Sequence, residues 1–203
     1  MKGNLIIISS PSGGGKGTLI KEVLGTVPNL SYSVSLTTRK IRDGEQEGKD
    51  YFFVTPEKFK ELINEDGFLE FAEVHGNYYG TLISTIQTES NAGRDIILEI
   101  DVQGAESVLA KMPEAVSIFI LPPSYECLRE RLTKRATESS DELDIRLKNS
   151  VAEVNRYTEF QYVIINDEIG DAVLNLTSII LAERQKRTRQ TESIQCILNS
   201  FVV

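Results

Sequence analysis

Four apolar runs, short and rich in β-branched residues, predict buried strands in this chain. They span residues 5–9, 96–100, 116–121 and 162–165. Stretches whose apolar residues recur at helical spacing lie between and after them, at 17–25, 83–91, 125–134, 141–157 and from 167 toward 186. Because strands that are apolar on both faces need helices on both sides, this alternation predicts an α/β fold with a parallel central sheet.

The middle of the chain departs from this alternation of buried strands and helices, and its elements are shorter and half-polar. Strands are expected at 31–35, 51–54 and 68–74, a proline-initiated helix at 56–64 and a loop at 76–80. We interpret residues 34–81 as a small subdomain inserted into the α/β core.

Length and charge limit what the protein can be. A chain of 203 residues, 40% hydrophobic and 26% charged, is typical of one globular domain. The net charge of −8 argues against a nucleic-acid or membrane partner, so any cations that handle phosphate must be gathered locally. No apolar run approaches the ~20 residues that span a bilayer. With no visible signal peptide and two distant cysteines that lack metal spacing, the expected location is the cytosol.

Residues 10–18, Ser-Pro-Ser-Gly-Gly-Gly-Lys-Gly-Thr, join the first strand to the first helix. Glycines at this place let main-chain N–H groups converge on an anion, and the helix N-terminus adds a partial positive charge. Lys16 would then reach the outer phosphates of a nucleoside triphosphate. The order of strand, glycine loop, lysine and helix therefore predicts a phosphate-binding loop.

This loop departs twice from the usual G-x-x-x-x-G-K-[ST] pattern. Ser10 stands in place of the first glycine, and Gly17 in place of the hydroxyl residue that usually contacts Mg²⁺. Either Thr18 substitutes for that hydroxyl, or the metal is held mainly by phosphate oxygens and water. The structural alternative is a glycine-rich turn that ends a strand and starts a helix.

A second polar stretch, residues 35–51, carries two arginines three residues apart. Arg39 and Arg42, with hydroxyl residues before them and Tyr51 after them, could clamp one phosphate, since the planar fork of arginine suits that geometry. Taken alone, the stretch could equally be a solvated charged loop.

The two stretches together resemble a known family. After the glycine loop the chain reads Ser-x-Thr-Thr-Arg-x-x-Arg-x-Gly-Glu-x-x-Gly-x-Asp-Tyr over residues 35–51. Further matching motifs lie at 76–80, 100–104, 122–124, 131–135, 146–147 and 165–167. In this order, and over about residues 3–185, they resemble the guanylate kinase family of nucleoside monophosphate kinases.

The resemblance implies transfer of the γ-phosphoryl group of ATP to GMP, and to dGMP, giving ADP and GDP. It implies Mg²⁺ as the cofactor that accompanies ATP. It also implies an α/β P-loop fold in three layers, with a mixed-β GMP-binding insert at about 34–81 and a helical lid at 127–156. The core would then comprise about 1–33, 82–126 and 157–190, followed by a tail at 191–203.

Site residues are carried over from the family position by position. ATP would be bound by Ser12, Gly13, Gly14, Gly15, Lys16, Gly17, Thr18, Arg131, Arg135, Asn166 and Asp167. GMP would be bound by Ser35, Arg39, Arg42, Glu45, Tyr51, Glu70, Tyr79, Thr81 and Asp101. The charge-neutralising residues of catalysis would be Lys16, Arg42, Arg135 and Arg146. No strong direct metal ligand is expected, although Thr18 or Asp101 could act through water.

Some of these residues have ordinary structural alternatives. Arg131 and Arg135 lie at helical spacing with nearby glutamates and could form a solvated, ion-paired helix face. Glu99 and Asp101 could be caps at a strand end. We expect Glu99 and Asp101, which are separated by one residue, to point to opposite faces and so not to share one role, and we assign contacts with guanine or metal-bound water to Asp101.

The tail beyond residue 190 carries an amphipathic stripe. Ile194, Ile197, Leu198 and Phe201 follow i, i+3, i+4, i+7 spacing. The tail could pack back on its own domain or fray, or it could bury this stripe against a second copy of the chain.

A protein of another class could also carry these motifs. A catalytically silent guanylate-kinase-like module would use the arginine clamp to bind a phosphorylated peptide. Such a module would not need Lys16, the glycine loop or the lid arginines, and all of them are present.

Overall fold

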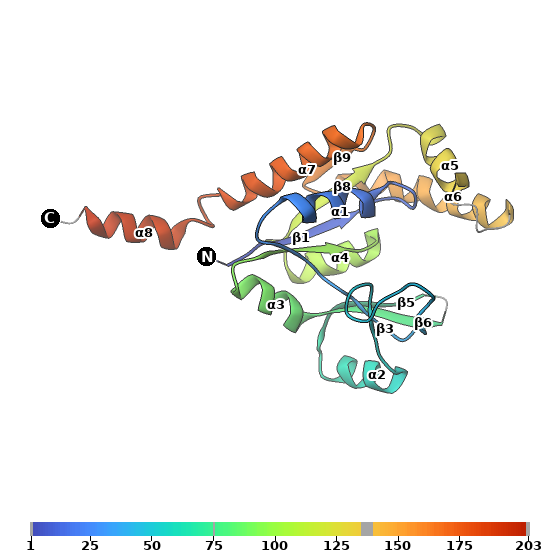
Figure 1. Ribbon diagram of the computed structural model, residues 1–203, viewed down its shortest axis with the longest axis horizontal. Coiled ribbons are helices and arrows are strands. Elements are labelled where there is room, and N and C mark those ends of the chain that lie inside the picture. The colour runs from blue at the N-terminus through green and yellow to red at the C-terminus, as the bar shows by residue number, and fades with distance from the viewer. Residues whose placement is uncertain (1, 75, 135–139, 202–203) are drawn as a thin grey trace.

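A five-stranded parallel sheet forms the centre of the protein (Figure 1). The computed structural model describes residues 2–74, 76–134 and 140–201, with backbone alone for 140–146. The strand order is β2 (Leu30–Tyr32), β7 (Asp95–Glu99), β1 (Leu5–Ser9), β8 (Val116–Leu121) and β9 (Tyr162–Ile165). All neighbouring strands pair in parallel, which confirms the predicted α/β class.

Helices cover both faces of this sheet, and β1 shows why. Its side chains alternate, so that Ile6 and Ile8 pack on one side and Leu5 and Ile7 on the other, all buried. Helices α1 (Lys16–Thr26) and α7 (Ile169–Arg184) close the first face. Helices α3 (Ile83–Asn91) and α4 (Val102–Lys111) close the second.

Helix α4 was not assigned by the sequence pattern. It begins directly after Asp101, whose carboxylate accepts the N–H of Gly104 at 2.8 Å as an N-cap. Buried Val102, Ala105 and Val108 then place its apolar face on the sheet. The capping aspartate is the local signal that could have revealed this helix.

A second, smaller sheet lies below the first in Figure 1. It contains β3 (Leu36–Thr37), β4 (Phe52–Phe53), β5 (Phe68–Val74) and β6 (Asn77–Leu82), in the order β4-β3-β6-β5. One pairing is parallel and two are antiparallel, so the sheet is mixed. Helix α2 (Pro56–Asn64) covers it through the buried ring of Phe59, which stacks on Phe68.

The loop expected at 76–80 is wrong, because Asn77–Leu82 is strand β6. The segment lacks alternating hydrophobicity, and its pairing with β5 and β3 makes it a strand. Gly80 allows this pairing, since a Cβ there would lie 2.8 Å from the ring of Phe68. The strand expected at 31–35 ends early, because β2 stops at Tyr32; residues 33–35 belong to no strand, and β3 of the second sheet begins at Leu36.

The described residues between β8 and β9 are mainly helical. Helix α5 (Tyr125–Lys134) packs on α6 (Ser140–Val154) through Leu128, Leu132 and Leu147. A 3-10 turn, η1 (Asn155–Glu159), ends this segment, where a continuous helix to residue 157 was expected. Within the described ranges, we find no helix with both the length and the hydrophobicity that crossing a bilayer requires.

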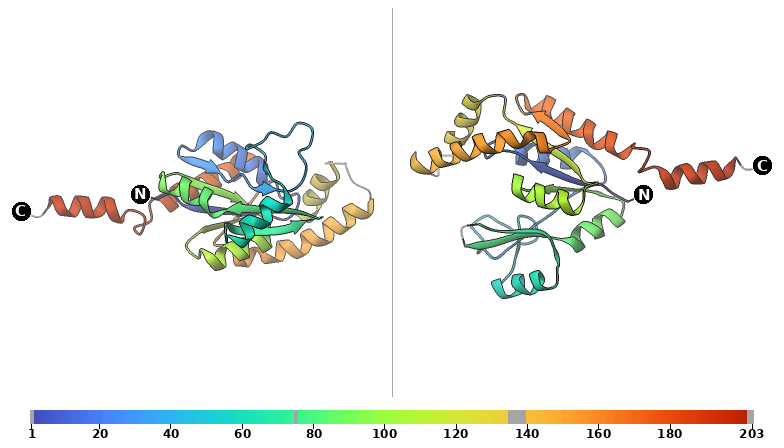
Figure 2. Two further views of the ribbon diagram at one scale, coloured as in Figure 1. Left: turned by 90° about the horizontal axis from the view of Figure 1, so that it is seen from below. Right: turned by 180° about the vertical axis from the view of Figure 1, so that it is seen from behind.

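The last helix, α8 (Thr191–Ser200), extends away from the body of the protein beyond the end of α7 (Figures 1 and 2). Its apolar stripe is exposed, from 38% at Ile194 to 75% at Phe201. The alternative in which the tail packs back on its own domain is therefore wrong for its described residues.

Candidate active site

The glycine loop wraps from the end of β1 to the start of α1. Gly13 and Gly15 have φ angles of 83° and 91°, a left-handed backbone that side chains with a Cβ rarely adopt. Gly15 is also the N-cap of α1 and offers no side-chain cap. The N–H groups of the first turn are thus presented toward any anion held by the loop.

Asn166, which follows β9, ties the loop to the far edge of the sheet. Its side-chain amide donates to the carbonyl of Gly14 at 2.9 Å, and it is buried. A Cβ on Gly15 would lie 2.3 Å from that amide nitrogen, so glycine is required there. The neighbouring Asp167 is exposed.

Arg131 reaches the same place from α5. Its Nη2 donates to the carbonyl of Asn166 at 2.9 Å. Its Nη1 is buried and has no hydrogen-bond partner among the described residues. This nitrogen lies 3.8 Å from the place that a Cβ on Gly15 would take. The solvated, ion-paired face is therefore wrong for Arg131. A buried, unpaired guanidinium nitrogen beside a phosphate loop is placed to receive an anionic ligand.

Helix α6 also contacts the loop. Ser150 Oγ donates to the carbonyl of Ser12 at 3.3 Å, and the N–H of Ser12 donates to Glu153 at 3.1 Å. The two other lid arginines of the sequence assignment lie outside the described residues, Arg135 entirely and Arg146 with its side chain.

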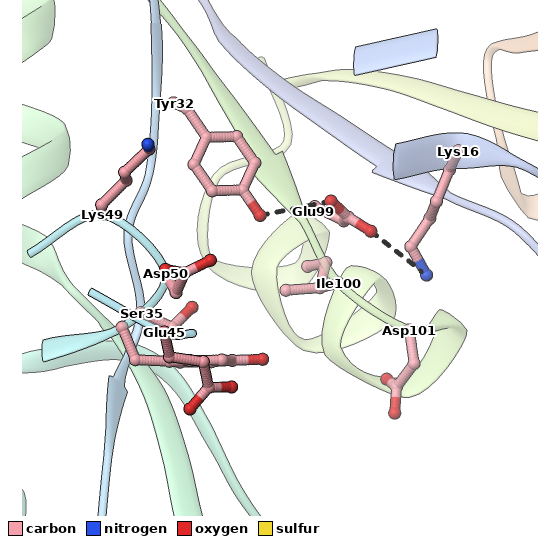
Figure 3. A pocket seen from close by; sticks show the side chains of 10 residues that line it. Lys16, Tyr32, Ser35, Glu45, Lys49, Asp50, Glu99, Ile100 and Asp101 are labelled. Atoms are coloured by element: carbon pink, nitrogen blue, oxygen red, sulfur yellow. Dashed lines mark hydrogen bonds and ion pairs between the residues drawn. The ribbon is translucent and has the colours of Figure 1, made fainter. Parts of the chain in front are cut away.

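Lys16 faces a cavity of about 440 Å³ between the two sheets (Figure 3). Its Nζ lies 3.9 Å from Glu99 Oε1, and the hydroxyl of Tyr32 donates to Glu99 Oε2 at 3.2 Å. Glu45 and Lys49 line the opposite side, as Figure 3 shows. Sequence reasoning missed Tyr32, Lys49 and Asp50 as lining residues.

The assignment of Glu99 and Asp101 to opposite faces is also wrong. Both line this cavity, Glu99 from the end of β7 and Asp101 from the N-cap of α4. Side chains two positions apart along a strand point to the same face, so strand geometry itself favours a shared side for these two residues.

A second cavity of about 390 Å³ adjoins the first. The two share the lining residues Ser35, Tyr51, Glu99, Ile100 and Asp101. Glu70 and Tyr79 line the second cavity from the small sheet. Together the cavities have the size and concave form of a site for a small polar molecule.

Glu70 is half-buried on β5 and faces this second cavity. The buried hydroxyl of Thr81 donates to Glu70 Oε1 at 2.7 Å and orients the carboxylate. Burial raises the pKa of Glu70, and the charge of Asp101 raises it further. Two carboxylates in one cavity suit a ligand that presents neighbouring N–H donors.

Arg39 makes a bidentate pair with Glu45, at 2.7 and 3.0 Å. The pair holds the pKa of Glu45 below its usual range and that of Arg39 above it. The guanidinium also lies over the ring of Tyr51, 5.4 Å from its centre. Arg42 is exposed; its main-chain N–H donates to the Glu45 carboxylate at 2.9 Å, and its carbonyl accepts the N–H of Glu45 at 3.1 Å.

Metal-binding residues are sparse. Among the described residues, no group of three or more His, Cys, Asp or Glu side chains is placed to hold a metal ion. Thr18 is exposed on the first turn of α1, and the carboxylate of Asp101 caps α4. Such a set fits a Mg²⁺ ion that keeps its waters and arrives on phosphate oxygens.

Comparison with known proteins agrees with this geometry. The family model described as guanylate kinase matches residues 2–183. The guanylate kinase of Thermotoga maritima is 47% identical over 195 residues, which cover 96% of this chain and 94% of that protein. The guanylate kinase of Caldanaerobacter subterraneus subsp. tengcongensis is 47% identical, with 94% and 93% covered.

A solved structure is similar as well. The crystal structure of guanylate kinase from Anaplasma phagocytophilum is 36% identical, with a TM-score of 0.73 over 93% of this chain and 89% of that one. With the family model matched over most of its length and relatives at nearly half identity, the chain belongs to the guanylate kinase family.

Proposed function

We propose that this protein transfers the γ-phosphoryl group of ATP to GMP, giving ADP and GDP. The observation that carries this proposal is the junction of two half-sites. A glycine loop with Lys16 opens onto a cavity that Asp101 also lines, and Glu70 lines the adjoining cavity. A phosphate donor and a nitrogen-rich base can therefore meet in one place.

Base selection rests on Glu70. Guanine presents N1–H and the 2-amino group side by side, and a carboxylate accepts from both. Adenine lacks both donors and would leave a half-buried carboxylate unpaired, so AMP is rejected strongly. Thr81 holds Glu70 in place, and Ser35 and Asp101 line the same cavity.

The acceptor phosphate would lie against the arginine clamp of Arg39 and Arg42 with Tyr51 and Tyr79. Arg39 is already fixed by Glu45, whereas Arg42 is exposed. We infer that residues of about 34–81 close toward the core when GMP binds and bring Arg42 to its phosphate. The lid, at 127–156, would bring Arg135 and Arg146 to ATP in the same motion.

Phosphoryl transfer needs positioning and charge neutralisation more than acid–base chemistry. The attacking phosphate of GMP is already anionic at neutral pH, so no general base is required. Lys16, Arg131 and the N–H groups of the loop would neutralise the phosphates of ATP. Mg²⁺, when bound with ATP, would supply further positive charge, with Thr18, Glu99 or Asp101 reaching its water shell.

The experiment is a coupled assay of ADP production with GMP, dGMP, AMP and UMP, each with and without Mg²⁺. We expect turnover with GMP and dGMP only, and only with Mg²⁺. Absence of turnover with GMP would refute the proposal. Binding of a phosphorylated peptide in place of GMP would then favour the silent interaction module.

We make two further proposals, one on self-association and one on the location of the protein. The exposed stripe of α8 would pair with a second copy of the chain, because a ten-residue helix has little stability without a packed face. A cytosolic location would suit the free thiols of Cys127 and Cys196.

A further inference from the structure

Tyr32, Glu99 and Lys16 form a chain of contacts on one wall of the cavity (Figure 3). The hydroxyl of Tyr32 donates to Glu99 Oε2 at 3.2 Å, and Glu99 Oε1 lies 3.9 Å from Lys16 Nζ. The three residues come from β2, β7 and α1, so the contacts depend on the tertiary fold.

The parallel pairing of β2 with β7 explains how Tyr32 reaches Glu99. Tyr32 is paired with Ile97, and Glu99 follows two residues later on the same face of the sheet. A tyrosine ring is long enough to span this diagonal, so its hydroxyl arrives at the carboxylate. Phenylalanine at this position would leave Glu99 without that donor.

The carboxylate of Glu99 lies near Gly17 of the glycine loop. A Cβ on Gly17 would point toward Glu99 and lie 3.9 Å from its Oε1. In the usual phosphate loop a hydroxyl projects from this position and contacts Mg²⁺. Here a carboxylate oxygen from β7 lies beside that place, and a glycine leaves the space before it open.

We propose that Tyr32 is a positioning residue of the phosphoryl-transfer site. Its hydroxyl fixes the Glu99 carboxylate beside Gly17, where Glu99 orients Lys16 before the nucleotide binds and then accepts hydrogen bonds from the water shell of nucleotide-bound Mg²⁺. This inference rests on the proposed function, because it assigns Tyr32 and Glu99 to the donor half of that site.

The environment of Tyr32 keeps its hydroxyl protonated, so that it remains a hydrogen-bond donor. Burial raises its pKa, and the neighbouring charges of Glu99 and Asp50 raise it further. The phenol therefore stays protonated at physiological pH, and it can fix one oxygen of Glu99 while the other remains free for Lys16 or for water.

The chain offers a matched control. Tyr162 and Glu183 form another tyrosine–glutamate hydrogen bond, 2.5 Å long, at the opposite edge of the same sheet. Neither residue lines the cavity at Lys16. Tyr162→Phe removes a phenolic oxygen, as Tyr32→Phe does. It therefore measures the general effect on the fold of losing a tyrosine–glutamate hydrogen bond.

The test measures ADP binding by calorimetry across a Mg²⁺ titration, without GMP and so without turnover. We expect the Tyr32→Phe variant to need about fivefold more Mg²⁺ to reach half of the Mg²⁺-dependent gain in ADP affinity, which corresponds to the loss of one hydrogen bond. ADP binding without the metal should be unchanged. Glu99→Gln should shift in the same direction, and adding Tyr32→Phe to it should have no further effect. Tyr162→Phe should bind as the unsubstituted protein does.

Other outcomes overturn the proposal. A Mg²⁺ dependence unchanged by Tyr32→Phe would refute it, as would an equal shift in Tyr162→Phe, which would point to a structural effect. Turnover of GMP by the unsubstituted protein is measured separately. Its absence would refute the proposed function while leaving the calorimetric result on Tyr32 interpretable.

Discussion

The carboxylate of Glu153 accepts the main-chain N–H of Ser12 at 3.1 Å, across 141 residues of sequence. Ser150, one turn earlier on α6, donates to the carbonyl of the same serine. Helix α6 thus contacts the glycine loop through both the main-chain N–H and the carbonyl of one residue. Movement of α6 and the shape of the loop are therefore coupled.

Loss of this contact should affect the loop and α6 together. We expect Glu153→Ala to lower the free energy of unfolding by about 1 kcal/mol and to raise the KM for ATP severalfold, because an acceptor for the Ser12 N–H is lost. Glu153→Gln retains an acceptor and should lie near the unsubstituted protein. Thermal unfolding and ATP kinetics measure both effects. Identical KM values for the alanine and glutamine variants would contradict the coupling.

The arginine clamp predicts a selective defect. Arg42→Ala should raise the KM for GMP by about 10- to 100-fold, since a charged contact to phosphate is lost, and should leave the KM for ATP nearly unchanged. Lys40→Ala is the control, because it removes a neighbouring exposed charge and leaves intact the carbonyl that accepts from Arg39. Steady-state kinetics with each nucleotide varied in turn distinguish the two. A normal KM for GMP in Arg42→Ala would exclude Arg42 from the clamp.

Glu70 predicts a pH dependence with a definite sign. Its pKa is raised in the folded protein, so GMP affinity should fall as the pH drops through that raised value and the carboxylate gains a proton. For stability the sign is opposite: the folded state binds this proton more tightly, so the free energy of unfolding falls as the pH rises from the ordinary value to the raised one.

Glu70→Gln separates these two effects. At neutral pH we expect a Tm about 1–3 °C higher, because a half-buried charge is gone, together with a KM for GMP raised about 100-fold. Glu73→Gln, on the exposed part of the same strand, is the control. Thermal melts and GMP kinetics at several pH values provide the measurement. Unchanged discrimination between GMP and AMP in Glu70→Gln would remove Glu70 from base recognition.

Gly80 should be essential to the small sheet. Gly80→Ala would bring a methyl group to 2.8 Å from the ring of Phe68 and 3.0 Å from the carbonyl of Glu70, so we expect a loss of about 1–3 kcal/mol. Gly25→Ala is the matched control, since an added Cβ would meet no described heavy atom within 4 Å apart from its chain neighbours and the backbone of its own helix. It should be neutral or stabilise α1 by up to ~1 kcal/mol. Denaturant unfolding that ranks the two equally would contradict this account.

Removal of residues 191–203 tests the tail. The deletion takes away the exposed stripe of α8 and leaves both cavities intact. We expect the full chain to associate in solution and the shortened chain to be monomeric, with GMP kinetics per chain retained. Light scattering after size-exclusion chromatography gives the mass. An identical mass for the two forms would rule out the tail as the interface.

Local patterns predicted the elements that depend on neighbouring residues. Strands β1 and β8 and helix α2 were expected from apolar runs and a starting proline, and they form there. Strand β9 also forms where it was expected, but it lies at the edge of the sheet and exposes Val163 and Ile165, so the expectation that it is buried is wrong. The glycine loop was equally predictable from the sequence, because the positive φ angles of Gly13 and Gly15 are a local requirement. Strand β6 was missed because its existence depends on pairing with β5 and β3.

The chemical groups proposed for the site can be identified from the sequence alone: a glycine loop with Lys16, an arginine pair, and acids at the ends of strands. Which of these groups lie close together depends on the tertiary fold. Glu99 joins Lys16 and Tyr32 because β7 ends at Glu99 and pairs with β2 in a register that aligns Tyr32 with Ile97. Strand register and strand ends are set by packing across the sheet, and no short stretch of sequence encodes them.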